Sequence, residues 1–325
     1  MLSLVRSDLY RLLRSKMIYA ALGFLVLYFA VNTWSLSGWE QPDNIARIKH
    51  ELAAQQVDPD VASRWTNEDL YSFETRTFES YTSSNIMGIA PGGLLGIVLC
   101  TLTALFCCQD FRNGFIKNQL TILAGHRAAG GRVPAGRGAY YAGKLITIAL
   151  VDALFLLTTM ALGFASYAIA GFTVRNPEPA WQIAVWALLT WLVLCGYTFA
   201  TAALTLAIRN QAFSVIAALA VGSQAFESAV GLVFEAIRQQ LPGTGLAAVA
   251  GTANTWLPAM STNILLDGAP ALFGSTTGTN GFWEATLQAL SSTAHPLAHV
   301  IATAFGFLTF TLAAVFIGCR RKDAA

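Results

Sequence analysis

The chain has 325 residues, of which 55% are hydrophobic and only 12% are charged, with a formal net charge of +2. Soluble domains carry about 25% charged residues. The 20 basic and 18 acidic residues are too few to cover a soluble protein of this size, and the mean hydropathy is +0.53. The composition therefore argues against a soluble enzyme, a disordered protein or a coiled coil, and favours a polytopic membrane protein.

Residues 1–16 are predicted to form an amphipathic elbow helix. One face carries only apolar side chains and the other is mainly basic and polar, and such a helix beside a span suits the headgroup layer of a membrane. A plain extension of the first span is the alternative. The apolar face comprises Leu2, Val5, Leu9, Leu12 and Leu13, and the polar face includes Ser7, Arg11 and Arg14.

Long windows without charge predict the spans. Met17–Trp39 has no charged residue over 23 positions, and Ser80–Gln109 has none over 30. A helix needs about 20 apolar residues to cross a bilayer core of about 30 Å, and in lipid its backbone must bond within the segment. The expected fold is therefore an all-α integral membrane protein with six transmembrane helices, at residues 17–37, 86–108, 145–171, 182–208, 212–234 and 298–318.

Basic residues near the spans predict the orientation. The N-terminal helix, residues 109–144, the turn at Arg209 and the tail 319–325 together carry 14 basic residues against three acids, Asp8, Asp110 and Asp323. Residues 38–85 carry nine acids and four basic residues. Both termini are thus expected in the cytoplasm. Residues 38–85 and 235–297 are expected outside, the second region with re-entrant or interfacial helices.

Two acids fall within or near predicted spans and are candidates for a pathway or gate. Asp152 lies eight residues past Lys144, about 12 Å along a helix, and carboxylates at such depth face a bundle interior or a water-filled path. Glu227 approaches the opposite end of the fifth span. A structural polar contact is the alternative for both acids, and it is favoured for Glu227.

Other motifs do not predict a catalytic or metal site. Gly138–Lys144 fits the first seven positions of a P-loop, but Leu145 cannot supply the hydroxyl that binds Mg²⁺. His295 and His299 share a helix spacing without an evident third metal ligand. None of the five cysteines lies in a predicted external loop, so no structural disulfide is expected. The chain is expected to have no cofactor and no nucleic-acid partner.

The segment from Asp110 to Lys144 resembles the permease subunits of ABC-2-type transporters. In that family an acid ends the second span and a Gly-x-Ile-Lys/Arg-Asn-x-Leu stretch follows; Arg-x-x-Tyr-Tyr-x-x-Lys then opens the third span. A Gly-rich insert at Ala128–Gly136 departs from the family pattern, so that either Arg127 or Arg137 matches the family arginine. The matching residues are Asp110, Gly114, Ile116, Lys117, Asn118 and Leu120 in the first part, and Arg137, Tyr140, Tyr141 and Lys144 in the second.

The resemblance implies the membrane subunit of an ABC exporter in the cell membrane. It implies a second permease subunit as partner and a separate cytoplasmic ATPase subunit that holds ATP and Mg²⁺. Residues 110–127 would dock in a groove of the ATPase and transmit its closure. The substrate would be a peptide antibiotic, a drug or another amphiphile. A secondary transporter coupled to protons through Asp152, a non-transporting membrane sensor and an intramembrane enzyme remain alternatives.

Overall fold

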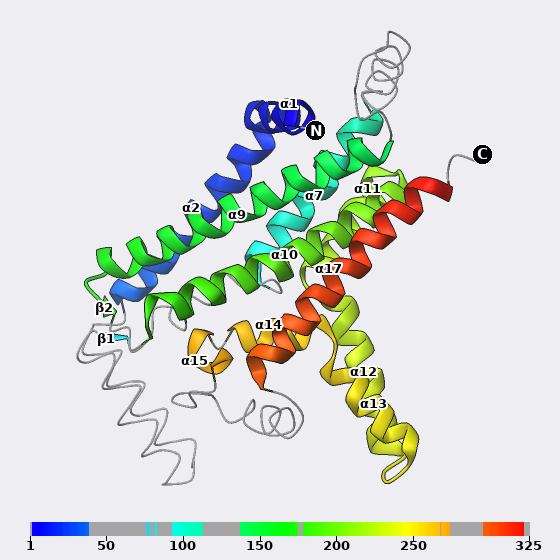
Figure 1. Cartoon of the computed structure of the whole chain (residues 1–325). Helices are drawn as coiled ribbons and strands as arrows, with labels where there is room; N and C mark the ends of the chain where they lie inside the picture. The colour runs from blue at the N-terminus through cyan, green and yellow to red at the C-terminus, as the bar shows by residue number, and fades with distance from the viewer. Residues whose placement is uncertain are drawn as a thin grey trace.

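The computed structural model describes residues 2–38, 77–78, 82, 93–112, 137–174, 178–266, 268–273 and 295–321. Almost all of these residues are helical (Figure 1). A two-residue parallel pairing, Thr77–Phe78 (β1) with Thr173–Val174 (β2), is the strand structure of the described part. The chain is therefore an all-α protein, as its composition predicts.

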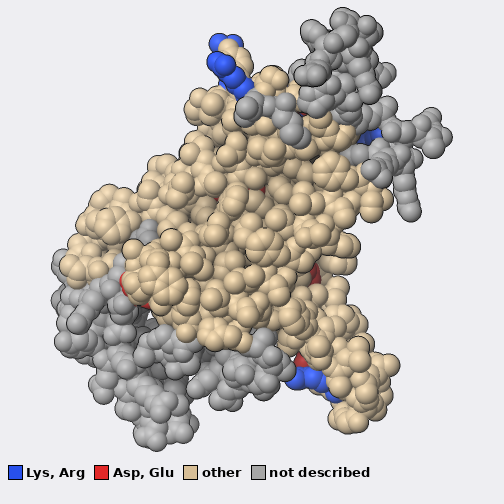
Figure 2. All heavy atoms as spheres, in the orientation of Figure 1, with Lys and Arg blue, Asp and Glu red and all other residues tan. Residues whose placement is uncertain are grey.

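Within the described residues, five single helices are long and apolar enough to cross a membrane. Their interiors are nearly free of charge, which is why each can stay helical in lipid. Figure 2 shows the consequence on one face of the molecule, where Lys and Arg lie near the two ends and the middle is mostly uncharged. The helices are α2 (Lys16–Gly38), α7 (Leu94–Arg112), α9 (Arg137–Ile169), α10 (Ala180–Ile208) and α17 (Pro296–Arg321).

The fifth predicted span, residues 212–234, is not one straight helix. It consists of α11 (Gln211–Gly222) and α12 (Ala225–Gln240), which meet at a bend of 54°. The two residues between them include Gln224, whose backbone is left-handed with φ of 56°. Gly222 and Ser223 directly precede Gln224, but such small residues are common in spans, and the bend was not predicted from the sequence.

Helix α1 (Leu2–Arg14) lies across one end of the bundle, which we call the α1 end (Figure 1). Ser15 separates it from α2, where the Ser15 side chain accepts a bond from the Met17 amide at 3.3 Å. Val5, Asp8 and Leu12 are buried, and α1 packs on α9. Leu13 was predicted on the apolar face but is exposed, so the buried stripe is narrower than expected.

Helix α10 is central and packs against α7, α9, α11 and α17. Its bulky side chains Trp186 and Tyr197 are buried. The Trp186 indole donates to the Leu265 carbonyl at 2.8 Å, and the Trp191 indole donates to the Ala149 carbonyl at 2.9 Å. A buried indole N–H needs such a partner, so these two bonds fix the rotation of α10 against its neighbours.

Three short helices follow α12: α13 (Gly245–Thr255), α14 (Pro258–Leu266) and α15 (Gly268–Leu272). They occupy the stretch in which short re-entrant or interfacial helices were expected. Helices α12 and α13 pack against each other and project from the body as an arm (Figure 1). Helix α14 packs on α17 and α10.

Candidate coupling site

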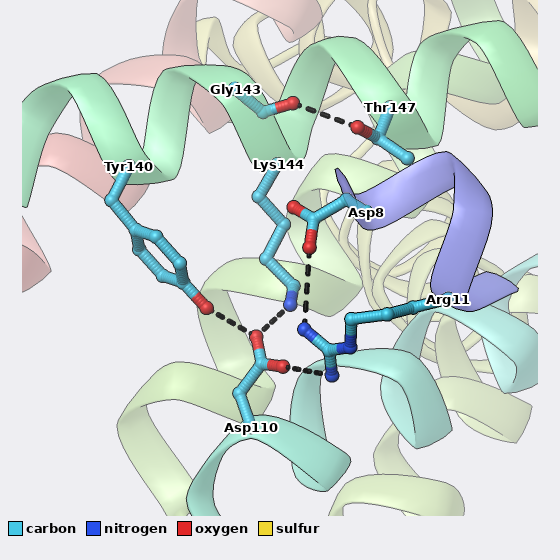
Figure 3. A network of polar contacts seen from close by, with 7 residues as sticks. All are labelled: Asp8, Arg11, Asp110, Tyr140, Gly143, Lys144 and Thr147. Carbon is cyan, nitrogen blue, oxygen red and sulfur yellow. Dashed lines mark hydrogen bonds and ion pairs between the residues drawn. The ribbon is translucent and has the colours of Figure 1, made fainter. Parts of the chain in front are cut away.

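A buried carboxylate at the end of α7 joins three helices at the α1 end. Asp110 Oδ1 accepts a hydrogen bond from Arg11 Nη2 on α1 at 2.9 Å. Its other oxygen, Oδ2, accepts from the Tyr140 hydroxyl on α9 at 2.5 Å and from the Lys144 ammonium on α9. Figure 3 shows these donors converging on Asp110 from two neighbouring helices.

A second carboxylate completes the network. Asp8, one turn before Arg11 on α1, accepts from Arg11 Nη1 at 3.3 Å. Burial raises the pKa of the Asp8 carboxyl, while the charges of Lys144 and Arg11 act in the opposite direction. The network thus holds two acids and two bases, and its formal charges balance. We call Asp8, Arg11, Asp110, Tyr140 and Lys144 the Asp110 network.

The Lys144 side chain is almost fully enclosed. It is 2% exposed, and its ammonium lies 4.0 Å from the centre of the Phe106 ring. An aromatic face favours a cation that has lost water, and Asp110 supplies the opposite charge. Burying an ion pair costs desolvation energy, and removing one partner from such a pair costs about 3–5 kcal/mol. The α7 and α9 ends are therefore strongly coupled.

The network brackets the cytoplasmic segment predicted to couple to an ATPase. Helix α7 ends at Arg112 and α9 begins at Arg137, so Asp110 and Lys144 stand close to the two points where that segment joins the bundle. The predicted coupling residues Gly114, Ile116, Lys117, Asn118 and Leu120 lie outside the described residues. Of the predicted coupling set, Asp110 is the member whose contacts are described.

The sequence did not indicate that Asp8 and Arg11 belong to this site. Arg11 was placed on the solvated face of the elbow helix, yet it binds Asp110. A signal was present in the charge count, because Asp8 and Asp110 are two of only three acids on the strongly basic side of the chain. An isolated acidic residue among many basic residues is a candidate for a buried ion pair.

The other two candidate acids lie elsewhere. Asp152 is buried on α9, and its Oδ2 accepts from the Thr198 hydroxyl at 2.7 Å. Its Oδ1 has no hydrogen-bond partner in the described part of the chain. Glu227 on α12 accepts from the Tyr197 hydroxyl at 2.9 Å and from the Ala259 amide at 2.6 Å.

The P-loop-like stretch has no nucleotide-binding geometry. Residues 138–144 are part of the continuous helix α9, and Lys144 is committed to Asp110. His299 packs against Trp256 with ring centres 4.6 Å apart, whereas His295 accepts from the Leu297 amide at 3.4 Å. Within the described residues, no group of three or more His, Cys, Asp or Glu side chains could hold a metal.

Comparison with known proteins agrees with the resemblance read from Asp110–Lys144. A family model described as ABC-2 family transporter protein matches residues 62–224, which is half of the chain. The match contains Asp110, Tyr140 and Lys144 and stops at Gln224. No curated protein and no solved structure matches the chain. The chain belongs to the ABC-2 transporter family, as a multi-pass membrane permease.

Proposed function

We propose that this chain is the permease subunit of an ABC exporter, and that a separate subunit binds and hydrolyses ATP with Mg²⁺. Family membership supports the transport role. The observation that carries the coupling proposal is the Asp110 network, because it ties together the helix ends on both sides of residues 113–136. A push on that segment would reach α7 and α9 at once.

The proposed mechanism is mechanical. An ATPase docked at the α1 end presses on residues 113–120, where Ile116 and Leu120 supply an apolar face and Lys117 and Asn118 supply polar contacts. The helix ends cannot slide apart cheaply, since sliding would expose or unpair buried charges. The displacement is therefore transmitted to the spans.

Several further features belong to the same proposal. The basic α1 end faces the cytoplasm of the cell membrane, in line with the distribution of Lys and Arg. Two permease subunits, identical or not, build one pathway, and lipid surrounds them. The substrate is a peptide antibiotic, a drug or another amphiphile, as the resemblance to ABC-2 permeases implies.

A second candidate function rests on Asp152. Its Oδ1 is buried without a partner among the described residues, and an intramembrane carboxylate of this kind can relay protons. A proton-coupled secondary transporter would work without an ATPase and would lose transport on Asp152→Asn. The ABC exporter would keep ATP hydrolysis in that variant.

Purification with and without a cognate ABC ATPase subunit tests the proposal. The chain alone should hydrolyse no ATP, and the co-expressed pair should purify together and hydrolyse ATP. Lys144→Ala should leave nucleotide binding by the pair intact, because Lys144 serves Asp110 and not a phosphate. Absence of a stable pair would contradict the proposed function.

A further inference from the structure

A left-handed residue breaks the fifth span deep in the bundle. Gln224 has φ of 56°, a conformation that costs energy for a residue with a side chain and persists only where its surroundings enforce it. The backbone at the break is satisfied, because the Ser223 amide bonds Leu219 and the Gln224 amide bonds Val221. Irregular backbone at membrane depth needs such bonds.

The side chain of Gln224 explains what enforces the break. Its Nε2 donates to the Tyr197 hydroxyl on α10 at 2.8 Å and to Thr262 Oγ1 on α14 at 2.7 Å. The same Tyr197 hydroxyl donates to Glu227 Oε2 on α12 at 2.9 Å, and the Ala259 amide donates to that oxygen at 2.6 Å. We call Tyr197, Gln224, Glu227, Thr262 and the Ala259 amide the Gln224 latch.

The Tyr197 hydroxyl of the latch lies within the spans and far from the α1 end. Tyr197 precedes Arg209 by 12 residues, which is about 18 Å along a helix and past the middle of a core of about 30 Å. The Tyr197 ring packs edge-on against Phe307 of α17, with centres 5.1 Å apart. A carboxylate and an amide at such depth are costly and are typical of functional positions.

The two halves of the broken span are held very differently. A Cβ on Gly222 would come within 2.8 Å of the Gly96 carbonyl oxygen and the Ile97 Cα, so the end of α11 is packed backbone to backbone on α7. Helix α12 has no buried residue, and its Phe226 and Leu232 are exposed. Beyond the latch, α12 therefore has few contacts with the described part of the body, and such segments move at the lowest cost.

We propose that the Gln224 latch is a gate contact of the transport cycle. The latch opens when α7 moves and carries α11 with it. Helix α12 is then released and swings away from α14. This inference rests on the proposed function, because the force on α7 is supplied by the ATPase. Tyr197, Gln224 and Glu227 are positioning residues that hold α12 in the closed arrangement. The arm formed by α12 and α13 moves as one piece, since these helices pack together.

Two buried serines provide matched reporters. Ser261 precedes Thr262 on α14, Ser214 lies on α11, and both are fully buried without a hydroxyl partner in the described part of the chain. Ser261→Cys and Ser214→Cys therefore change one atom each without removing a latch bond. The permease and its ATPase are reconstituted together in nanodiscs and treated with a water-soluble maleimide. The reaction is run in the presence of ATP, with and without Mg²⁺. The chain that has only its native cysteines gives the background labelling.

We expect Ser261→Cys to be labelled about tenfold faster during hydrolysis, while Ser214→Cys stays unlabelled. Tyr197→Phe removes the hydroxyl shared by two latch bonds. It should raise labelling of Ser261→Cys about tenfold without ATP, even in the isolated permease. Glu227→Gln keeps an oxygen acceptor and should leave the labelling rate of Ser261→Cys near its original value.

The outcomes separate the two proposals. If the pair hydrolyses ATP while Ser261→Cys is labelled no faster than Ser214→Cys, the latch does not open and the inference is wrong. If Tyr197→Phe leaves labelling of the isolated permease unchanged, the latch does not hold α12. Failure of the pair to assemble or hydrolyse ATP would instead contradict the proposed function, and the gate role would fall with it.

Discussion

The Asp110 side chain on α7 joins three helices at the α1 end. Its two oxygens accept bonds from Arg11, Tyr140 and Lys144 on two other helices (Figure 3). The charge on Asp110 is needed because Lys144 has lost nearly all contact with solvent. The arrangement stabilises the α1 end only while both charges are present.

A double-mutant cycle measures this dependence. Asp110→Asn removes the charge but little volume, so Lys144 is left buried and unpaired; we expect a loss of about 3–5 kcal/mol in stability. Adding Lys144→Met, which keeps an unbranched chain over Phe106, should recover most of that loss. Thermal unfolding of the detergent-solubilised chain is the measurement.

The control for this cycle is an exposed ion pair. Arg238 Nη2 and Glu235 Oε1 lie 2.8 Å apart on α12, and the Arg238 side chain is largely exposed. Glu235→Gln should leave the unfolding temperature unchanged, because solvent screens such pairs. If Asp110→Asn behaves like Glu235→Gln, the Asp110 network does not couple the helices.

At the scale of elements, a backbone-to-backbone contact joins α7 to α11. Gly222 permits it, since any Cβ there would meet the α7 backbone. Small residues allow such approach in membranes, where helices pack without a hydrophobic driving force. This contact links α7, which carries Asp110 near its end, to the broken fifth span.

Gly222→Ala should push α11 away from α7 and cost about 1–3 kcal/mol. Gly23→Ala on α2 and Gly306→Ala on α17 are matched controls, because a Cβ at either position meets nothing within 4 Å. We expect the unfolding temperatures of these two variants to equal or slightly exceed that of the original protein. A Gly222→Ala protein as stable as the controls would show that the contact is loose.

The sequence predicted elements better than it predicted contacts. Charge-free windows indicated helices because a segment without charge can enter lipid, and in lipid its backbone must form hydrogen bonds within the segment. The bend at Gln224 was missed, since its cause is a set of bonds to Tyr197 and Thr262, which are distant in sequence. Asp110, Tyr140 and Lys144 were identified through the family resemblance, but their convergence with Arg11 is tertiary and leaves no local pattern.

At the scale of the whole molecule, charge asymmetry is the main evidence for orientation. Fourteen basic residues on one side of the predicted spans predict that the α1 end lies in the cytoplasm. The same end carries the Asp110 network, so orientation and coupling depend on each other. A reversed molecule would present the proposed docking segment to the outside.

Cysteine labelling of intact cells tests the orientation. In a variant without native cysteines, Ser63→Cys and Ser275→Cys should react with an impermeant thiol reagent, and Ala129→Cys should react only after the membrane is opened. Labelling of Ala129→Cys in intact cells would reverse the orientation. The docking proposal would then have to be abandoned.

The measurement that tests the central claim most directly is the amount of ATPase that co-purifies with each permease variant. Ile116 and Leu120 are one helical turn apart and would share one face of a short helix. Ile116→Ala combined with Leu120→Ala should reduce the ATPase-to-permease ratio and the ATPase activity per permease. Ile122→Ala, two positions beyond Leu120, should reduce neither, and permease abundance should be equal in all variants. A normal ratio and normal activity in the double variant, at normal abundance, would contradict the account.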